Sequence, residues 1–367
     1  MDSTWYTLRE EDSILSPALL IYPHRVWTNI VRMLKITDGP ERLRPHVKTH
    51  KMAEVVSMQL ASGIRKFKAA TIAEAEMLAG TGAEDVLLAY PLVGPNLDRF
   101  VALQQQFPQV IFQAVVDHAE VLELMSECFS YHGLEIPTLV DLDLGLQRTG
   151  CSLEEAYALY QAIAELPGIF PGGLHAYDGH LSQRDYEERK AAVMEVYQPV
   201  TELKERLIAE GFEVPAFVCG GSPTFAIHAE YPDRECSPGT CVLWDAGYQH
   251  LAEEVPFEPA IALFTRVVSR PGRNLLCLDL GTKSLSTDSA ERVQFPDYPD
   301  AKIVHHYEEH MVIELPGADQ IALGKALYGI PWHVCPTVAL FEEATVVEDG
   351  IARGTWQVLA RRRKITV

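Results

Sequence analysis

The sequence contains no apolar run of the roughly 18 residues that a membrane-spanning helix needs. Basic residues are also scarce: 31 lysines and arginines stand against 51 acidic residues, which gives a formal net charge of −20. A surface this acidic repels phosphate backbones and anionic lipid headgroups, so we expect neither nucleic acid nor membrane partners. Residues 1–5 lack the basic stretch and following apolar segment of a signal peptide, so none is expected.

Cysteine is used sparingly and without pattern. The chain has seven cysteines, an odd number, and no two of them form a CxxC motif. This usage is typical of free thiols in a reducing compartment and argues against a disulfide framework. We therefore expect a cytoplasmic protein.

Short apolar runs alternate with amphipathic segments through the first two thirds of the chain. The runs are rich in Val, Leu, Ile and Phe, which is typical of strands buried on both faces and joined by crossover helices. Eight such strands predict a (β/α)8 barrel of the TIM type, with an open doubly wound sheet as the alternative. The expected strands are 43–49, 66–70, 85–90, 110–117, 137–145, 172–177, 216–221 and 236–242.

The helical pattern stops near residue 245. Beyond it, apolar or alternating runs are separated by proline and glycine, which predicts an all-β domain. We therefore divide the chain into a barrel over 24–245 and a β domain over 246–367. An expected strand at 17–22 precedes the barrel, so we assign 1–23 to the β domain and expect this strand to pair there.

The stretch from Arg44 to Lys51 holds two lysines, two histidines and an arginine where a buried strand is expected to end. Active sites of (β/α)8 barrels lie at the carboxyl ends of the strands. Desolvation and neighbouring cations such as Arg44 would disfavour the charged form of Lys48 there. A neutral amine is what nucleophilic attack on a carbonyl requires, although a basic surface loop explains these eight residues equally well.

Two glycine-containing turns follow the seventh and eighth expected strands. Gly221, Ser222 and Thr224 lie in the first, and Gly239 and Thr240 in the second. Loops at these positions are the usual phosphate cradle of barrel enzymes. A nucleophilic lysine together with a phosphate cradle suggests pyridoxal 5′-phosphate, whose aldehyde binds lysine.

Other candidates lie at the ends of strands. His175 and Tyr177 are two residues apart on the sixth expected strand, so both side chains point to the same face. This spacing is consistent with a position beside the cofactor ring and equally with a hydrogen-bonded position in the interior. Arg148 suits a cofactor oxygen, a substrate carboxylate or a surface ion pair.

In the β domain, His333 and Cys335 are two residues apart and would project from one face of an extended strand. Imidazole and thiolate together suit Zn²⁺ or a related divalent ion and would leave positions open for water and substrate. We therefore expect a divalent metal (Zn, Mn or Mg) here. The nearby cluster of His305, His306 and His310 we interpret as solvated.

Seven motifs in order resemble one family: RPHVKTHK, ATIAEAE, DLDLGLQRTG, GLHAYDGH, GGSPTF, CSPGT and PWHVCPT. Together they are similar to the D-threonine aldolase and D-serine dehydratase family, which are alanine racemase-like, fold type III pyridoxal phosphate enzymes. The resemblance implies that Lys48, and not Lys51, carries the cofactor as a Schiff base, with Tyr177 near its ring. It also implies that Ser222, Thr224, Gly239 and Thr240 hold the phosphate, that His333 and Cys335 bind the metal, and that the protein is a homodimer with the active site near the subunit interface.

The resemblance favours aldol cleavage of a small D-3-hydroxy amino acid to glycine and an aldehyde, with His175 or metal-bound hydroxide as the base. A dehydratase that releases a 2-oxo acid and ammonia is the alternative, because His-x-Cys is the pattern of the zinc-dependent dehydratases. A metal-free racemase would need neither His333 nor Cys335. A non-catalytic carrier of the cofactor would not need a second domain.

Overall fold

The computed structural model describes residues 5–367 and divides the chain into two compact units. One unit contains the chain up to Ile30, Thr49–Met52 and Thr240–Arg361, and the other contains Val31–Lys48, Ala53–Gly239 and Arg362–Val367. We call them the β unit and the barrel unit. The last six residues, which the sequence analysis assigned to the β domain, thus group with the barrel.

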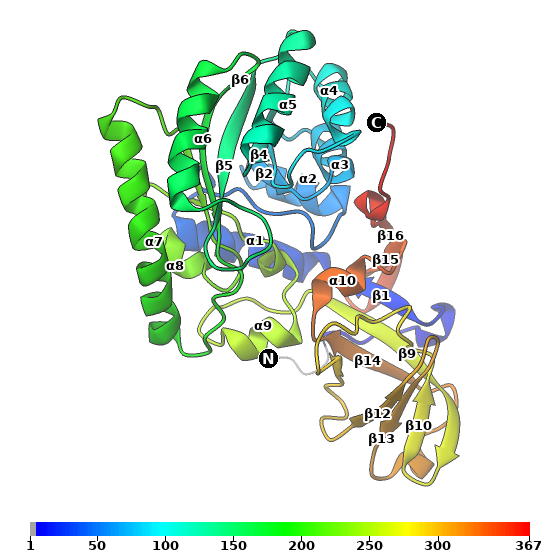
Figure 1. Cartoon of the computed structure of the whole chain (residues 1–367). Coiled ribbons are helices and arrows are strands. Elements are labelled where there is room, and N and C mark those ends of the chain that lie inside the picture. The colour runs from blue at the N-terminus through cyan, green and yellow to red at the C-terminus, as the bar shows by residue number, and fades with distance from the viewer. Residues whose placement is uncertain (1–4) are drawn as a thin grey trace. The chain divides into compact units, whose positions relative to one another are not determined.

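The barrel unit is built on seven parallel strands whose order in the sheet is their order in the chain. Helices α3 to α6 lie outside the sheet in Figure 1, and each follows one strand and precedes the next. The strands are β2 (Lys66–Ala69), β3 (Asp85–Leu88), β4 (Ile111–Val116), β5 (Ile136–Asp143), β6 (Ile169–Tyr177), β7 (Ala216–Cys219) and β8 (Glu235–Cys236). The helices are α2 (Ala53–Ala61), α3 (Ile72–Thr81), α4 (Asn96–Gln106), α5 (Ala119–Tyr131), α6 (Leu153–Glu165), α7 (Tyr186–Ala209) and α8 (Phe225–Ala229), with α1 (Pro23–Thr37) shared between the units.

The segment at 43–46 closes the sheet into a barrel. Leu43 bridges to Cys236 on β8 and His46 bridges to Lys68 on β2, both in the parallel sense. Because the two edge strands are joined in this way, the predicted (β/α)8 barrel is confirmed and the open sheet is wrong. The predicted strand at 43–49 forms only these two isolated bridges, since Pro45 lacks an N–H for the ladder. The last strand, β8, is shorter than predicted and ends before Pro238-Gly239.

Helix starts in the barrel unit follow local sequence signals. Thr71 caps α3 by accepting a hydrogen bond from the Glu74 amide, and Ser152 with Glu155 forms a capping box at α6. Helix α3 ends at Gly82, whose φ of 104° is a left-handed conformation that favours glycine. The caps at Thr71 and Ser152 fix where the loops from β2 and β5 end and the following helices begin.

The β unit is a mixed sheet in which β1 (Ala18–Ile21) pairs antiparallel with β9 (Ile261–Gly272) and parallel with β15 (Glu343–Glu348). The expected pairing of the first strand with the β domain is thus confirmed. The remaining strands are β10 (Leu275–Leu278), β11 (Val293–Gln294), β12 (Lys302–His306), β13 (Met311–Glu314), β14 (Ala326–Pro331) and β16 (Ile351–Gln357), with short helices α9 (Ala246–Leu251) and α10 (Val334–Val338). An aromatic and aliphatic core lies against β1, β9 and β14.

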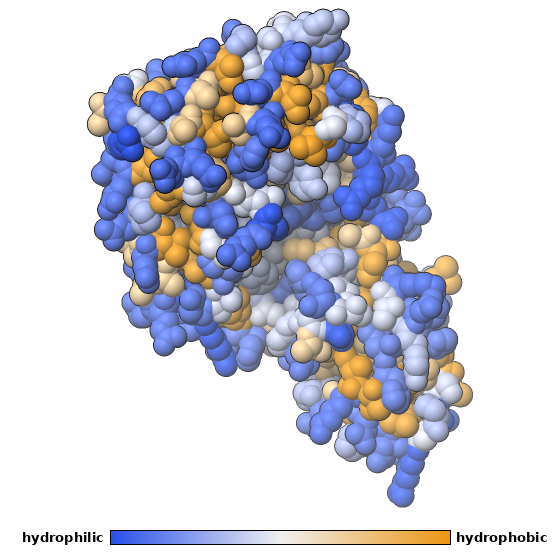
Figure 2. Space-filling view, in the orientation of Figure 1, coloured by the Kyte–Doolittle hydropathy of each residue, from blue (hydrophilic) through white to orange (hydrophobic). Residues whose placement is uncertain are grey.

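The surface agrees with the composition. Hydrophilic residues predominate on the face shown in Figure 2, with apolar residues between them. All seven cysteines are free thiols. Within the described residues, no helix combines the length and apolar character that crossing a membrane requires.

A buried ion-pair cluster holds the barrel seam. The Arg44 side chain is 1% exposed and donates to Asp85 of β3 at 2.6 Å and to Glu235 of β8 at 2.7 Å. Lys66 of β2 also contacts Glu235. Arg44 is therefore paired with two carboxylates and is not an isolated cation.

We expect Arg44→Met to lower the free energy of unfolding by about 3–5 kcal/mol, because it leaves the largely buried Asp85 without its cation and leaves Glu235 with Lys66 alone. Urea denaturation followed by circular dichroism measures this change. Arg65→Met is the matched control, since the ion pair of Arg65 with Glu84 is solvent-exposed and its loss should leave stability nearly unchanged. An equal loss in both variants would contradict the assignment.

Candidate active site at the barrel mouth

Three cationic side chains surround the ring of Tyr177 at the carboxyl end of β6. The Lys48 Nζ atom lies 5.5 Å from the ring centre, the Lys68 Nζ atom 5.6 Å, and the Arg148 guanidinium carbon 5.0 Å. In a chain with a net charge of −20, this concentration of positive charge attracts an anionic ligand to the barrel mouth. Lys51 belongs to the β unit and is not part of this group.

Lys68 was not singled out from the sequence, although it stands inside an expected buried strand. The residue is 2% exposed, and its Nζ atom lies 3.4 Å from the His175 Nε2 atom. The His175 Nδ1 atom lies 2.6 Å from Asp141 Oδ1, and the Thr149 hydroxyl donates to Asp141 Oδ2 at 3.0 Å. The buried His175 ring on β6 thus lies between Asp141 and Lys68.

The pKa values in this chain of contacts shift away from their usual ranges. Burial, assisted by the charge of Lys48, lowers the pKa of Lys68 to about 7. Burial also lowers the pKa of His175. Burial alone would raise the pKa of Asp141, but the adjacent imidazole and Thr149 lower it overall. A carboxylate, a neutral imidazole and an amine that titrates near neutral pH thus lie in series.

The loop after β7 contains buried hydroxyl groups, those of Ser222 and Thr224, next to glycine amides. Gly220 has a φ of 73°, and a Cβ there would come within 2.4 Å of the His228 ring. The Gly221 amide donates to Thr224 Oγ1 at 3.3 Å, and the Gly239 amide donates to Ser222 Oγ at 3.3 Å. Four of the five predicted phosphate ligands are thereby gathered at the ends of β7 and β8. Small buried hydroxyls and close backbone approach fit a phosphate group.

Thr240 is the fifth predicted ligand and groups with the β unit. Its Oγ1 atom lies 3.3 Å from the Cys335 Sγ atom. The role of Thr240 toward a phosphate stays a prediction.

A buried hydrogen-bond network of Asp178, His228 and Arg234 contacts the loop after β7 through Thr224. Asp178 accepts from Thr224 Oγ1 at 2.9 Å and contacts His228 Nε2 at 2.7 Å. Arg234 contacts His228 Nδ1 at 2.9 Å, and because a guanidinium only donates, Nδ1 is the acceptor and Nε2–H donates to Asp178. The sequence motif GLHAYDGH contained Asp178, but nothing in the sequence indicated its partners.

The candidate metal pair lies in the β unit. His333 caps the start of α10 and Cys335 lies in its first turn, so the expected extended strand at this point is wrong. The two side chains are nevertheless hydrogen-bonded to each other. The Cys335 Sγ atom also lies 3.1 Å from Thr49 Oγ1, while the His333 Nδ1 atom lies 2.6 Å from Asp288 Oδ2.

The donor set of this pair fits a divalent metal. Asp288, which the sequence analysis missed, holds Nδ1 and so directs Nε2 away from itself, the usual arrangement of a histidine ligand. The thiol of Cys335 has a lowered pKa because the His333 imidazole outweighs the opposing effect of burial. Among residues 5–367, no cluster of three or more His, Cys, Asp or Glu side chains is arranged to bind a metal. A metal held by two protein ligands keeps open positions for water and substrate.

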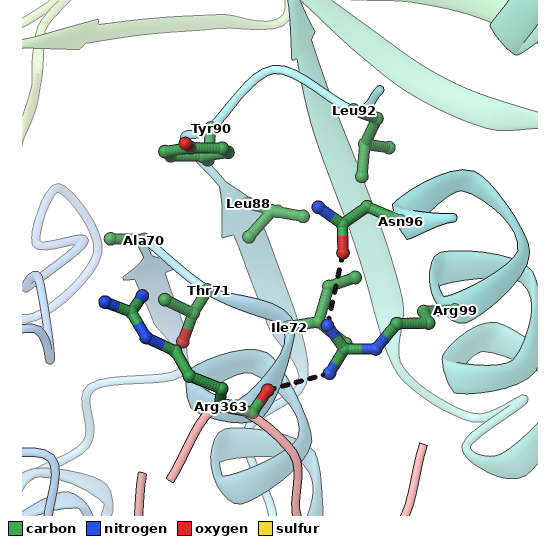
Figure 3. A pocket seen from close by; sticks show the side chains of 9 residues that line it. All are labelled: Ala70, Thr71, Ile72, Leu88, Tyr90, Leu92, Asn96, Arg99 and Arg363. Atoms are coloured by element: carbon green, nitrogen blue, oxygen red, sulfur yellow. Dashed lines mark hydrogen bonds between the residues drawn. The ribbon is translucent and has the colours of Figure 1, made fainter. Parts of the chain in front are cut away.

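A separate hollow of about 180 Å³ lies at the carboxyl ends of β2 and β3 (Figure 3). Arg99 donates to Asn96 Oδ1 at 3.1 Å and to the Arg363 carbonyl at 2.9 Å, which holds the last residues against α4. Glu76 on α3 accepts from the Thr366 amide at 2.9 Å. The Arg363 side chain extends along Thr71 at the rim of this hollow. Arg363 therefore forms part of one wall of the hollow.

Comparison with known proteins gives matches over both parts of the chain. The model described as "Alanine racemase, N-terminal domain" matches residues 21–245, and that described as "Putative serine dehydratase domain" matches residues 260–347. A D-threonine aldolase from Arthrobacter sp is 29% identical over 326 residues, which are 87% of this chain and 85% of that protein. A D-threo-3-hydroxyaspartate dehydratase from Delftia sp. is 25% identical over 95% of this chain and 99% of its own.

A solved structure has the same fold. The crystal structure of D-threonine aldolase from Filomicrobium marinum superposes with a TM-score of 0.89 and 26% identity, over 97% of this chain and 98% of that one. The predicted alanine racemase-like architecture, a barrel with an all-β domain, is thereby confirmed.

We expect Asp178→Asn to weaken binding of pyridoxal 5′-phosphate at least tenfold, because an amide cannot accept from both Thr224 and His228 as the carboxylate does. Titration of the cofactor-free protein, followed by the visible absorbance of the bound cofactor, measures the affinity. Asp233→Asn is the control, since Asp233 pairs with Lys204 at the surface. Unchanged affinity in Asp178→Asn would show that this network does not shape the phosphate cradle.

Proposed function

Because the chain belongs to the alanine racemase N-terminal domain family, we propose that it is a lyase dependent on pyridoxal 5′-phosphate and a divalent metal. The proposed reaction is aldol cleavage of a D-3-hydroxy amino acid to glycine and an aldehyde. The observation that carries this proposal is the amine of Lys48 at the Tyr177 ring, in the same barrel mouth as the buried hydroxyls of Ser222 and Thr224. The likeness to a D-threonine aldolase over most of both chains supports the reaction type.

Each predicted residue has one role in this proposal. Lys48 binds the cofactor covalently, Tyr177 lies beside its ring, and His333 with Cys335 holds the metal. The phosphate is held by Gly221, Ser222, Thr224, Gly239 and Thr240. When bound, the cofactor supplies an electron sink and the metal supplies Lewis acidity toward the substrate hydroxyl. The chain itself must position the substrate and take the proton of its β-hydroxyl, a role for which the sequence nominated His175.

The dehydratase alternative rests on Cys335 and on the likeness to the Delftia enzyme. In that reaction Lys48 would take the α-proton, and a metal held by His333 and Cys335 would supply Lewis acidity toward the β-hydroxyl. A racemase would leave the His333–Cys335 pair without a purpose. The homodimeric state and the cytoplasmic location implied by the resemblance stay predictions.

Product analysis separates these reactions. We expect D-threonine to give glycine and acetaldehyde, whereas pyruvate and ammonia from D-serine would establish the dehydratase and L-enantiomers the racemase. Lys48→Ala should lose more than a thousandfold in activity together with the visible absorbance of bound cofactor. Lys51→Ala is the matched control from the same motif and should keep both. A surviving absorbance band in Lys48→Ala would refute the assignment of the cofactor lysine.

Metal removal tests the second half of the proposal. We expect a chelator to abolish cleavage and an added divalent ion to restore it. Cys335→Ala should lose bound metal in elemental analysis, and Asp288→Asn should weaken metal affinity by about 10–100-fold through misorientation of His333. Cys277→Ala, which alters a cysteine on β10, should retain the metal. Full activity after exhaustive removal of metal would exclude the role given to His333 and Cys335.

A further inference from the structure

Lys68 is a buried lysine without a carboxylate partner. Its side chain is 2% exposed, and no ion pair joins its amine to Asp or Glu in the part of the chain that the structure describes. Lysine is almost never fully buried unless it is paired, and a buried lysine has its charged form disfavoured. The nearby Lys66, on the same strand, shows the usual arrangement, since it is paired with Glu235.

The hydrogen bonds fix the tautomer of His175. Asp141 has a lowered pKa and is therefore a carboxylate at neutral pH, so the His175 Nδ1 atom must carry the proton that they share. His175 is neutral because burial lowers its pKa, and its Nε2 atom is consequently an acceptor. The amine of Lys68, 3.4 Å away, donates one N–H to Nε2.

This arrangement occupies both ring nitrogens of His175. A substrate hydroxyl would have to displace Lys68 before Nε2 could take its proton. A neutral Lys68 amine, in contrast, keeps its lone pair after donating one N–H to the imidazole. The same amine lies at the Tyr177 ring, as does that of Lys48.

We propose that Lys68, and not His175, is the general base of this site, and that His175 and Asp141 are positioning residues that orient the Lys68 amine. In this arrangement the Asp141 carboxylate orients the His175 imidazole, and the imidazole in turn orients the reacting amine of Lys68. Catalytic triads orient their nucleophile through a carboxylate and an imidazole in the same order. This inference rests on the proposed function for the identity of the substrate.

The proton balance closes on one residue. The Lys68 amine takes the proton of the β-hydroxyl, so an O–H bond breaks and an N–H bond forms while the oxygen electrons make the aldehyde carbonyl. The electron pair of the broken Cα–Cβ bond would be delocalised into the electron sink that the bound cofactor supplies, until a proton arrives at Cα. The Lys68 ammonium returns its proton there, which yields glycine and restores the neutral amine. No net proton, oxidant or further reactant is needed.

The sign of the pH dependence follows from the requirement for a neutral amine. The charged and titratable groups that face or act on Lys68 share the barrel mouth with it: Lys48, Arg44, Asp141, Asp178, His175 and Tyr177. The pKa of Lys68 lies at about 7, so the amine is protonated and inactive well below that pH and neutral above it. We expect kcat/KM for cleavage to rise with pH through an acidic limb centred near 7.

Substitution at three positions tests the assignment. Lys68→Met and Lys68→Arg should each lower kcat/KM by about 10²–10⁴-fold, because methionine lacks the amine and arginine stays protonated. His175→Gln keeps an acceptor for Lys68, so it should lose far less activity and keep the acidic limb. Bound cofactor absorbance confirms an intact site in each variant. The proposal is overturned if Lys68→Arg stays within tenfold of the unsubstituted enzyme, or if His175→Gln loses the limb.

Two further measurements separate this inference from the proposed function. The first uses NMR of cofactor-free protein labelled with carbon-13 at lysine Cε. One Cε resonance should titrate near pH 7, and this resonance should be absent from Lys68→Met. Titration of every lysine near pH 10 would contradict the inference. In deuterated water, the enzyme should exchange an α-hydrogen of glycine in a Lys68-dependent manner. Exchange without cleavage of any D-3-hydroxy amino acid would reject the proposed function and leave the base standing. Cleavage that is insensitive to Lys68→Met would reject the base alone.

Discussion

The ion pairs of Arg44 at the barrel seam are the interaction on which the site depends. The segment at 43–46 is not a regular strand, but backbone hydrogen bonds join it to both edges of the sheet, among them Arg44 N–H to the Cys236 carbonyl and Lys68 N–H to the Pro45 carbonyl. The Arg44 guanidinium, placed between Asp85 and Glu235, adds a buried side-chain attachment to this backbone pairing. Lys48 follows four residues later, and Lys68 lies on the strand that the same segment bridges. The contacts that close the barrel therefore also position the amines of Lys48 and Lys68.

Two histidines in the barrel unit are held by the same device with different outcomes. His228 lies between Asp178 and Arg234, and His175 lies between Asp141 and Lys68. In each case a carboxylate fixes the protonated nitrogen and the side chain of a basic residue donates to the other one. Arginine cannot lose its proton in a protein, so the first arrangement is static and suits support of a loop. Lysine can, so the second arrangement is able to exchange a proton.

Much of the candidate site could be predicted from the sequence, because its residues follow successive apolar runs that form the strands of the barrel. Lys48, Tyr177 and the glycine turns follow apolar runs, and strand ends of a parallel barrel meet on one face. Lys68 was missed because its chemistry arises from burial and from His175, a contact over 107 positions that no local pattern encodes. Asp288 escaped notice for the same reason, being 45 positions from His333. The extended geometry expected at His333 failed because α10 begins directly after that residue.

The chain passes between its two units at five points, after residues 30, 48, 52, 239 and 361. Neither unit is a continuous stretch of sequence, and α1 itself belongs to both. A single cut or a single exchange of gene segments could not deliver either unit whole. Evolution of this architecture by swapping one half for another would have required several coordinated breakpoints, so the two units are expected to have diverged together.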